Sequence, residues 1–179
     1  MTVKLIILAL GLTFFLSICG QRQVENKDKV VGSTSLQLDT SLIAVLPLDT
    51  AQCWVFKDCS PADLTNDDLI QIERLLRDCI DKYNSVQEKR FSEIKAKYSG
   101  HIFYKEHFVI DIKLYRRQYI AVTNKAGERE VWINCFCDKD EAYWKTGIVE
   151  VLDGGNCYFN LRINLTKGIY FELMVNGVA

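Results

Sequence analysis

The seven cysteines are the side chains of this sequence best suited to chemistry, because a thiolate can act as a nucleophile, a redox group or a metal ligand. Cys135 and Cys137 lie two residues apart on a predicted strand, so both sulfur atoms should face the same side. Together with Cys157 they could serve a thiol-dependent enzyme or a redox protein. A zinc site would need paired C-x2-C spacings or nearby histidines, and the sequence has neither. We favour buried thiols with one or two disulfides, for which Cys53–Cys59 is one candidate pair.

The two histidines, His101 and His107, are the bases that a cysteine nucleophile would have to recruit. Neither stands in a local catalytic motif, so we expect both on the surface. Basic and acidic residues are nearly balanced, at 22 against 23, and the chain therefore lacks the positive excess of a nucleic-acid-binding protein. The sequence predicts no catalytic residue, no metal ligand, no cofactor and no nucleic-acid partner.

The first 19 residues have the pattern of a secretory signal peptide. Lys4 precedes the apolar run 5–18, which is too short to span a bilayer comfortably. Leu16–Gly20 resembles a lipobox and predicts a lipoprotein anchored in a membrane through Cys19, although Ile18 stands where that motif has Gly, Ala or Ser. Two alternatives stay open: ordinary cleavage just after Cys19 or Gly20, giving a periplasmic or secreted protein, and an uncleaved segment retained as an anchor. In each case the folded part lies outside the cytoplasm.

The rest of the chain divides into a tether and one domain. Residues 20–36 are mostly polar and predict the tether, and residues 37–179 predict a single domain large enough to bury its own core. Within that domain, Leu42–Leu46 predicts a short edge strand that ends at Pro47, and residues 54–56 predict another extended piece.

A long helix begins after Thr65, which is a good N-cap, with Asp68 three residues later completing a capping box. Leu64 and Leu69 occupy the two positions of a hydrophobic staple. One face of the helix carries apolar residues at helical spacing: Leu69, Ile72, Leu76, Cys79, Ile80 and Tyr83. We expect Asn84 and Ser85 to end this helix and a short second helix to cover residues 91–98.

From about residue 107 the apolar period changes from 3.6 to 2, which predicts strands. The alternation predicts one strand over 108–114, a hairpin of 119–123 with 130–137, and a last hairpin of 157–165 with 169–175. In the last hairpin we expect Leu165 opposite Ile169 and Arg162 opposite Glu172. The fold class is α+β: two layers, with one long helix packed on a four- to five-stranded antiparallel sheet.

The outer face of this sheet, away from the helix, is the predicted binding surface. If odd-numbered residues of the late strands face the helix, aromatic and apolar side chains face outward: Trp132, Phe136, Tyr158, Tyr170 and Met174, joined by Tyr119 if Ile120 and Val122 point inward. Such a face could bind a peptide, a glycan or a partner protein. We favour the alternative that residues 40–57 cover it as part of the core.

Several segments resemble a family of small exported, uncharacterised proteins of Bacteroidetes-type bacteria: Leu64–Leu69, Tyr115–Ile120, Glu130–Cys137, Gly154–Asn160 and Val175–Ala179. The resemblance spans about residues 40–179, and it implies export and a single α+β domain but transfers no activity. The helix-on-sheet plan is similar to that of cystatin-like domains by architecture alone. The sequence thus predicts a non-catalytic exported or envelope-anchored binding module. A thiol-dependent protein and an inhibitor or immunity-type protein are its alternatives.

Overall fold

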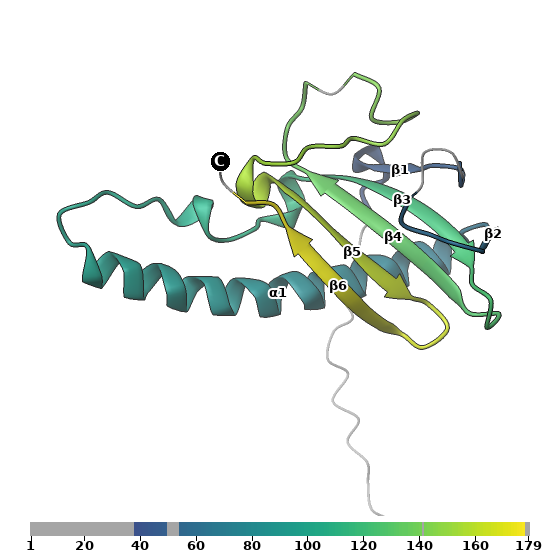
Figure 1. The fold of residues 1–179 in the computed structure, drawn as a ribbon, viewed down its shortest axis with the longest axis horizontal. Coiled ribbons are helices and arrows are strands. Elements are labelled where there is room, and N and C mark those ends of the chain that lie inside the picture. Colours follow the sequence, from purple (N-terminus) through teal and green to yellow (C-terminus); the bar gives the residue numbers. More distant parts are fainter. Residues whose placement is uncertain (1–37, 50–53, 141, 178–179) are drawn as a thin grey trace, which may run out of the picture. The chain divides into compact units, whose positions relative to one another are not determined.

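The computed structural model describes residues 38–49, 54–140 and 142–177. The predictions for the signal peptide, for Cys19 and for the tether concern residues outside these ranges. The predicted Cys53–Cys59 pair also lies outside them, because Cys53 is not among the described residues. The described chain forms one long helix, α1 (Asn66–Lys97), packed on one face of a six-stranded sheet, as Figure 1 shows. The predicted α+β class with a helix layer on a sheet layer is confirmed.

The strands run in the order β1-β3-β4-β5-β6, and β2 pairs with β3 outside this path. Their bounds are β1 (Ile43–Val45), β2 (Ser60–Pro61), β3 (Arg116–Thr123), β4 (Arg129–Phe136), β5 (Tyr158–Asn164) and β6 (Ile169–Val175). Short 3-10 turns cover Thr40–Leu42, Lys105–His107, Ile112–Leu114 and Gly155–Cys157. The sheet is mixed rather than purely antiparallel, because the edge strand β1 runs parallel to β3.

The start of α1 follows the predicted capping box. The Thr65 side chain accepts a hydrogen bond from the Asp68 backbone N–H at 3.2 Å, and Asp68 accepts one from the Thr65 backbone N–H at 2.7 Å. The guanidinium of Arg129 at the start of β4 reaches Asp68 with both Nη atoms at 2.8 Å. The first turn of the helix is thereby joined directly to the sheet.

The predicted helix end at Asn84–Ser85 is wrong, since α1 continues to Lys97 and absorbs the predicted second helix. The Asn84 side chain does not bond its own helix. It donates to the Ile110 carbonyl and accepts from the Ile110 N–H, both at 2.8 Å. No Gly or Pro follows until Gly100, so nothing in the backbone stops the helix earlier.

The predicted strand over 108–114 is also absent. Residues 98–109 fold back along the second half of α1, which extends beyond the sheet (Figure 1). Phe108 packs edge-on against Phe91 with ring centres 5.3 Å apart, and Lys105 pairs with Glu88 at 2.6 Å. The alternation therefore reflects burial of Ile110 and Ile112 under the helix and not pairing in the sheet.

The predicted hairpin of β3 and β4 is confirmed, while the register of the last hairpin is right at one end only. Far from the turn, Asn160 pairs with Met174 as expected, but near the turn Arg162 pairs with Phe171 and Asn164 with Ile169. A bulge at Glu172, whose φ is +54°, takes up the difference of one residue. Gly168 adopts the left-handed φ of +67° expected for the loop.

The slip is accompanied by contacts between cationic side chains and aromatic rings. It carries Phe171 to the outer face, where the Arg162 guanidinium lies 5.2 Å from the Phe171 ring and 4.9 Å from the Phe56 ring. Tyr170 moves to the helix side, where Lys82 lies 5.0 Å from its ring centre. Arg162 still reaches the predicted partner Glu172 at 3.4 Å.

Each face of the sheet has its own core. On the inner face, α1 packs on the odd-numbered residues of β3, β4 and β5, which include Tyr119, Ile133 and Leu161. On the outer face, Ile120, Val122, Trp132 and Phe136 pack against segments without regular structure. Among the described helices, none is long and apolar enough to cross a membrane.

Candidate functional site

The outer face of the sheet is covered, as the favoured prediction held. Trp132 and Phe136 are 4% and 0% exposed, and Tyr158 is half-buried against the same core. Ala44, Leu46 and Phe56 from the predicted cover contribute to it. The structure corrects three details: Tyr119 and Tyr170 pack on the helix side, and residues 54–56 form a turn instead of an extended piece.

A second cover, residues 144–151, was not foreseen. Residues 148–151 cross the outer face without strand pairing, and the side chains of Trp144 and Val149 are buried in its core. This segment and the turn at residues 54–56 close the outer face without any regular element.

Two buried amides, Gln118 on β3 and Asn134 on β4, hold this second cover in place. Gln118 Nε2 donates to the carbonyls of Trp144 and Gly147, and its Oε1 accepts from the Val149 N–H at 3.0 Å. Asn134 Nδ2 donates to Gln118 Oε1 at 3.0 Å and to the Val149 carbonyl at 2.7 Å. Carbonyl partners fix the orientation of both amides, since a carbonyl only accepts.

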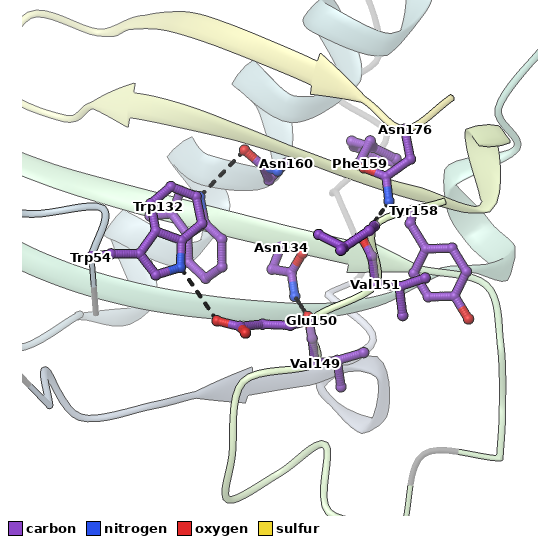
Figure 2. A pocket seen from close by; sticks show the side chains of 11 residues that line it. Trp54, Trp132, Asn134, Val149, Glu150, Val151, Tyr158, Phe159, Asn160 and Asn176 are labelled. Carbon is purple, nitrogen blue, oxygen red and sulfur yellow. Dashed lines mark hydrogen bonds between the residues drawn. The ribbon is translucent and has the colours of Figure 1, made fainter. Parts of the chain in front are cut away.

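Between this cover and the sheet lies a cavity of about 230 Å³, which we call the outer cavity (Figure 2). Its walls come from the turn at Trp54, the cover segment, and strands β4 and β5. The lining residues are Trp54, Trp132, Asn134, Val149, Glu150, Val151, Leu152, Tyr158, Phe159, Asn160 and Asn176. Most of the wall is apolar or aromatic and a few polar groups converge on it, which is the usual make-up of a small-ligand site.

The polar groups of the outer cavity have fixed roles. Asn134 is 9% exposed, and its Oδ1 accepts no hydrogen bond from any described residue. Asn160 Oδ1 accepts from Trp132 Nε1 at 3.4 Å, so its Nδ2 is turned away from that contact and donates to no described residue. The cavity therefore presents one amide acceptor and one amide donor to a ligand.

Trp54 and Glu150 close one side of the outer cavity. The Trp54 indole is 66% exposed, and its Nε1 donates to Glu150 Oε1 at 3.3 Å, as Figure 2 shows. At the other end, Asn176 Nδ2 donates to the carbonyls of Val151 and Asp153 at 2.6 and 2.9 Å. These bonds keep both ends of the cavity rim in a defined position.

Glycine is required beside this rim at Gly154. Its φ is +87°, and a Cβ there would lie 2.6 Å from the Tyr158 ring. The Tyr158 hydroxyl donates to Asp138 Oδ2 at 3.2 Å. The Tyr158 ring is thus held between the turn at Gly154 and the loop at Asp138, where it forms part of the cavity wall.

The described cysteines are either paired in a disulfide or at least partly buried. Cys137 and Cys157 form a disulfide, which joins the end of β4 to the turn before β5. Burial raises the pKa of the Cys135 thiol well above its usual value and that of Cys79 to about 11. A thiolate is the reactive form of cysteine, and in this structure Cys135 is a buried thiol while Cys137 and Cys157 are joined to each other. Cys59 is half-buried, and its Sγ lies 3.2 Å from the Lys57 carbonyl.

His101 and His107 lie on the arm formed by the end of α1 and the returning chain, with their rings near Tyr98 and Tyr104 respectively. Neither lines the outer cavity. Across the described part of the chain, no group of three or more His, Cys, Asp or Glu residues is placed to hold a metal ion.

The sequence reasoning missed a cluster of buried polar groups on the inner face. Glu73 of α1 is 2% exposed, pairs with Arg117 Nε at 3.3 Å and accepts a hydrogen bond from the Tyr119 hydroxyl. Burial, with the Glu73 charge second, raises the pKa of Tyr119 well above its usual value. The signal was available: Glu73 interrupts the apolar face of the helix, and Arg117 alternates in phase with Tyr119 on β3.

No protein-family model, curated protein or solved structure matches this chain.

Proposed function

We propose that this chain is an exported, non-catalytic binding module, held at the cell envelope through Cys19, whose ligand occupies the outer cavity. The signal-like pattern of residues 1–19 and the resemblance to small exported proteins support the location. The membrane association proposed here comes from a lipid anchor on Cys19.

The observation that carries the proposal is the carbonyl of Asn134. Its Oδ1 is an acceptor to which no described residue donates a hydrogen bond. This one lines a cavity, and the Asn134 amide cannot turn over because its Nδ2 is bound to Val149 and Gln118. A ligand that donates a hydrogen bond would satisfy it.

The make-up of the wall indicates a neutral ligand. Among the described lining residues Glu150 is the only carboxylate, and no lysine, arginine or histidine joins it. The ligand should combine an apolar face for Trp54 with groups that both donate to Asn134 and accept from Asn160. The same lining supports binding without catalysis, because it brings no acid–base pair and no activated nucleophile together.

Saturation-transfer NMR on the full chain tests the site with four neutral probes: glucose, N-acetylglucosamine, N-acetyl-leucinamide and benzamide. We expect at least one probe to receive saturation, and Val151→Trp, which fills the cavity, to abolish the signal. Ile102→Trp is the matched control, because it adds the same side chain at a position that is 81% exposed and far from the cavity. If no probe distinguishes Val151→Trp from the unaltered chain, the outer cavity is not a binding site for these classes.

The location is tested separately by expressing the full chain in a didermic bacterium and labelling it with an alkyne-tagged palmitate. We expect the label in the membrane fraction and its loss in Cys19→Ser, while Cys79→Ser keeps it because that thiol is buried in the core. An unlabelled protein in the periplasm would support export without the anchor. An unlabelled protein in the cytoplasm would overturn the proposed location.

A further inference from the structure

Two further hollows adjoin the outer cavity and share lining residues with it or with each other. A smaller one of about 110 Å³ shares Trp54, Trp132 and Asn160 with the outer cavity. A wider one of about 480 Å³ shares Trp54, Val55 and Arg162 with the smaller one. Trp54 borders all three, so the hollows form one groove that runs over β4 and β5 toward the loop at Asn124.

We propose that this groove binds a neutral oligosaccharide, with the outer cavity as one of at least three sugar subsites. The inference rests on the proposed function and names the class of its ligand. A pyranose ring has an apolar C–H face, which packs on an indole, and an edge of hydroxyl groups, each of which both donates and accepts. The groove supplies both kinds of contact along its length.

The charge of the groove favours a neutral chain. In the described part of the chain, its ionisable lining residues other than tyrosine and cysteine are three basic and three acidic ones: Lys57, Lys125, Arg162, Glu130, Glu150 and Glu172. Arg162 is already engaged by two of the acids, with Nη2 at 2.5 Å from Glu130 and Nη1 at 3.4 Å from Glu172. An anionic or cationic polymer would find no net opposite charge along this path.

The same geometry disfavours an extended peptide. Peptides that bind to sheets usually add a strand to a free edge and are held by backbone hydrogen bonds. The floor of the groove is β4 and β5, and both are internal strands whose backbones are paired on each side. Recognition here must come from side chains, and Asn134 Oδ1 and Asn160 Nδ2 supply one acceptor and one donor to the hydroxyl groups of a sugar.

Trp54 provides the central stacking surface of the proposed groove. Its ring is 66% exposed, yet its Nε1–H bond to Glu150 restrains it against the groove. A flat aromatic group that is both accessible and restrained loses little conformational entropy when a ring stacks on it. Removing it should therefore weaken every subsite that it borders.

Calorimetric titration of the full chain tests the inference with maltotriose, cellotriose and N,N′,N″-triacetylchitotriose, each against its monosaccharide, and with a blocked trialanine peptide. We expect one trisaccharide to bind at least about tenfold more tightly than its monosaccharide, and Trp54→Ala to weaken it by about tenfold or more. Lys57→Ala, at the far hollow, should weaken the trisaccharide about fivefold and leave the monosaccharide unchanged. Tyr104→Ala, an exposed aromatic residue on the distant arm, is the control and should change neither.

The other outcomes separate this inference from the proposed function. Equal affinity for a trisaccharide and its monosaccharide would overturn the extended groove and leave the outer cavity as a single site. Binding of the blocked peptide but of no sugar would overturn the ligand class. If none of the sugars bind while another neutral probe still occupies the cavity in the NMR test, the oligosaccharide inference fails and the proposed function stands.

Discussion

The two faces of the sheet are closed in different ways. On the inner face, one 32-residue helix lies along the strands and its side chains interlock with Tyr119, Ile133 and Leu161. On the outer face, the segment 144–151 is held mainly by amide side chains of β3 and β4, and the turn at Trp54 by the Trp54–Glu150 hydrogen bond and the contact of Arg162 with Phe56. The same three central strands thus support a core closed by a helix and a core closed by loops.

The way in which each face is closed explains why the hollows lie on the outer face. A helix presents a row of side chains every 5.4 Å and fills the space above a sheet evenly. Irregular segments leave their backbone carbonyls and N–H groups to be satisfied one at a time, and here Gln118 and Asn134 do so. Where such segments diverge, the sheet keeps hollows with ordered polar walls, which is the property that a ligand site requires.

Glu73→Ala should produce the largest effect, on the inner face. It leaves Arg117, which is 4% exposed, without its carboxylate and removes the acceptor of the Tyr119 hydroxyl. Breaking a buried pair from one side costs about 3–5 kcal/mol, so the urea midpoint should fall steeply. Glu88→Ala on the exposed part of α1, whose partner is Lys105, should cost less than about 1 kcal/mol.

A double variant separates the cost of an unpaired buried charge from the cost of lost packing. Glu73→Leu with Arg117→Met replaces the pair by apolar side chains and should recover most of the stability lost in Glu73→Ala. If Glu73→Ala costs no more than Glu88→Ala, the inner face does not depend on this cluster. The contrast with the outer face would then rest on packing alone.

Loss of the Cys137–Cys157 disulfide should rank second. The bond closes a separation of 20 residues that includes the whole 144–151 cover, and loops of this size contribute about 3 kcal/mol when cross-linked. We expect Cys137→Ser with Cys157→Ser to lower the free energy of unfolding by about that amount. Proteolysis should then begin in residues 138–156. Cleavage that begins instead in the arm at 98–109 would show that the bond does not restrain the outer cover.

Gln118→Leu should have a smaller effect that is confined to the outer face. It removes the groups that bind Trp144, Gly147 and Val149, at a cost of about 2 kcal/mol. Hydrogen exchange at the Val149 amide should accelerate, because its acceptor is gone. Gln71→Leu is the matched control on α1, where the amide donates a single bond to the Leu165 carbonyl. It should leave Val149 exchange unchanged.

Local patterns of the sequence predicted those parts of the fold that depend on neighbours in the chain. The capping box at Thr65 and the β3–β4 hairpin followed from spacing alone. The end of α1 did not, because the partner of Asn84 is Ile110, on a segment that periodicity assigned to a strand. Alternation reports which side chains are buried, and it does not report whether a sheet or a helix buries them.

The candidate site was predictable only in outline. Alternation placed Trp132, Phe136 and Tyr158 on the outer face, and the composition of residues 40–57 predicted that this face is covered. The one-residue slip at Arg162 was not predictable, because it depends on Phe56, which lies more than a hundred residues earlier. The roles of Gln118 and Asn134 likewise depend on a cover segment with no pattern of its own.

The smallest predicted effect concerns pH and the junction of α1 with β4. The Arg129 guanidinium, with a smaller contribution from Thr65, lowers the pKa of Asp68 from 3.8 to about 2. A depressed carboxyl pKa stabilises the fold above the unfolded value, and that contribution is lost as the pH falls from about 4 to about 2. Because Arg129 is 37% exposed and partly screened by water, we expect about 1 kcal/mol rather than the full value.

Asp68→Asn should therefore lower the free energy of unfolding at pH 7 and flatten its decline between pH 4 and pH 2. Asp67→Asn, one residue earlier in the same helix turn, is the control and should keep the acid dependence, because no side-chain partner holds its carboxylate in the described chain. If both variants keep the same slope, the inner face draws no stability from this contact. The helix would then be positioned on the sheet by its apolar stripe and the Glu73 cluster, and by no ion pair at its N-terminus.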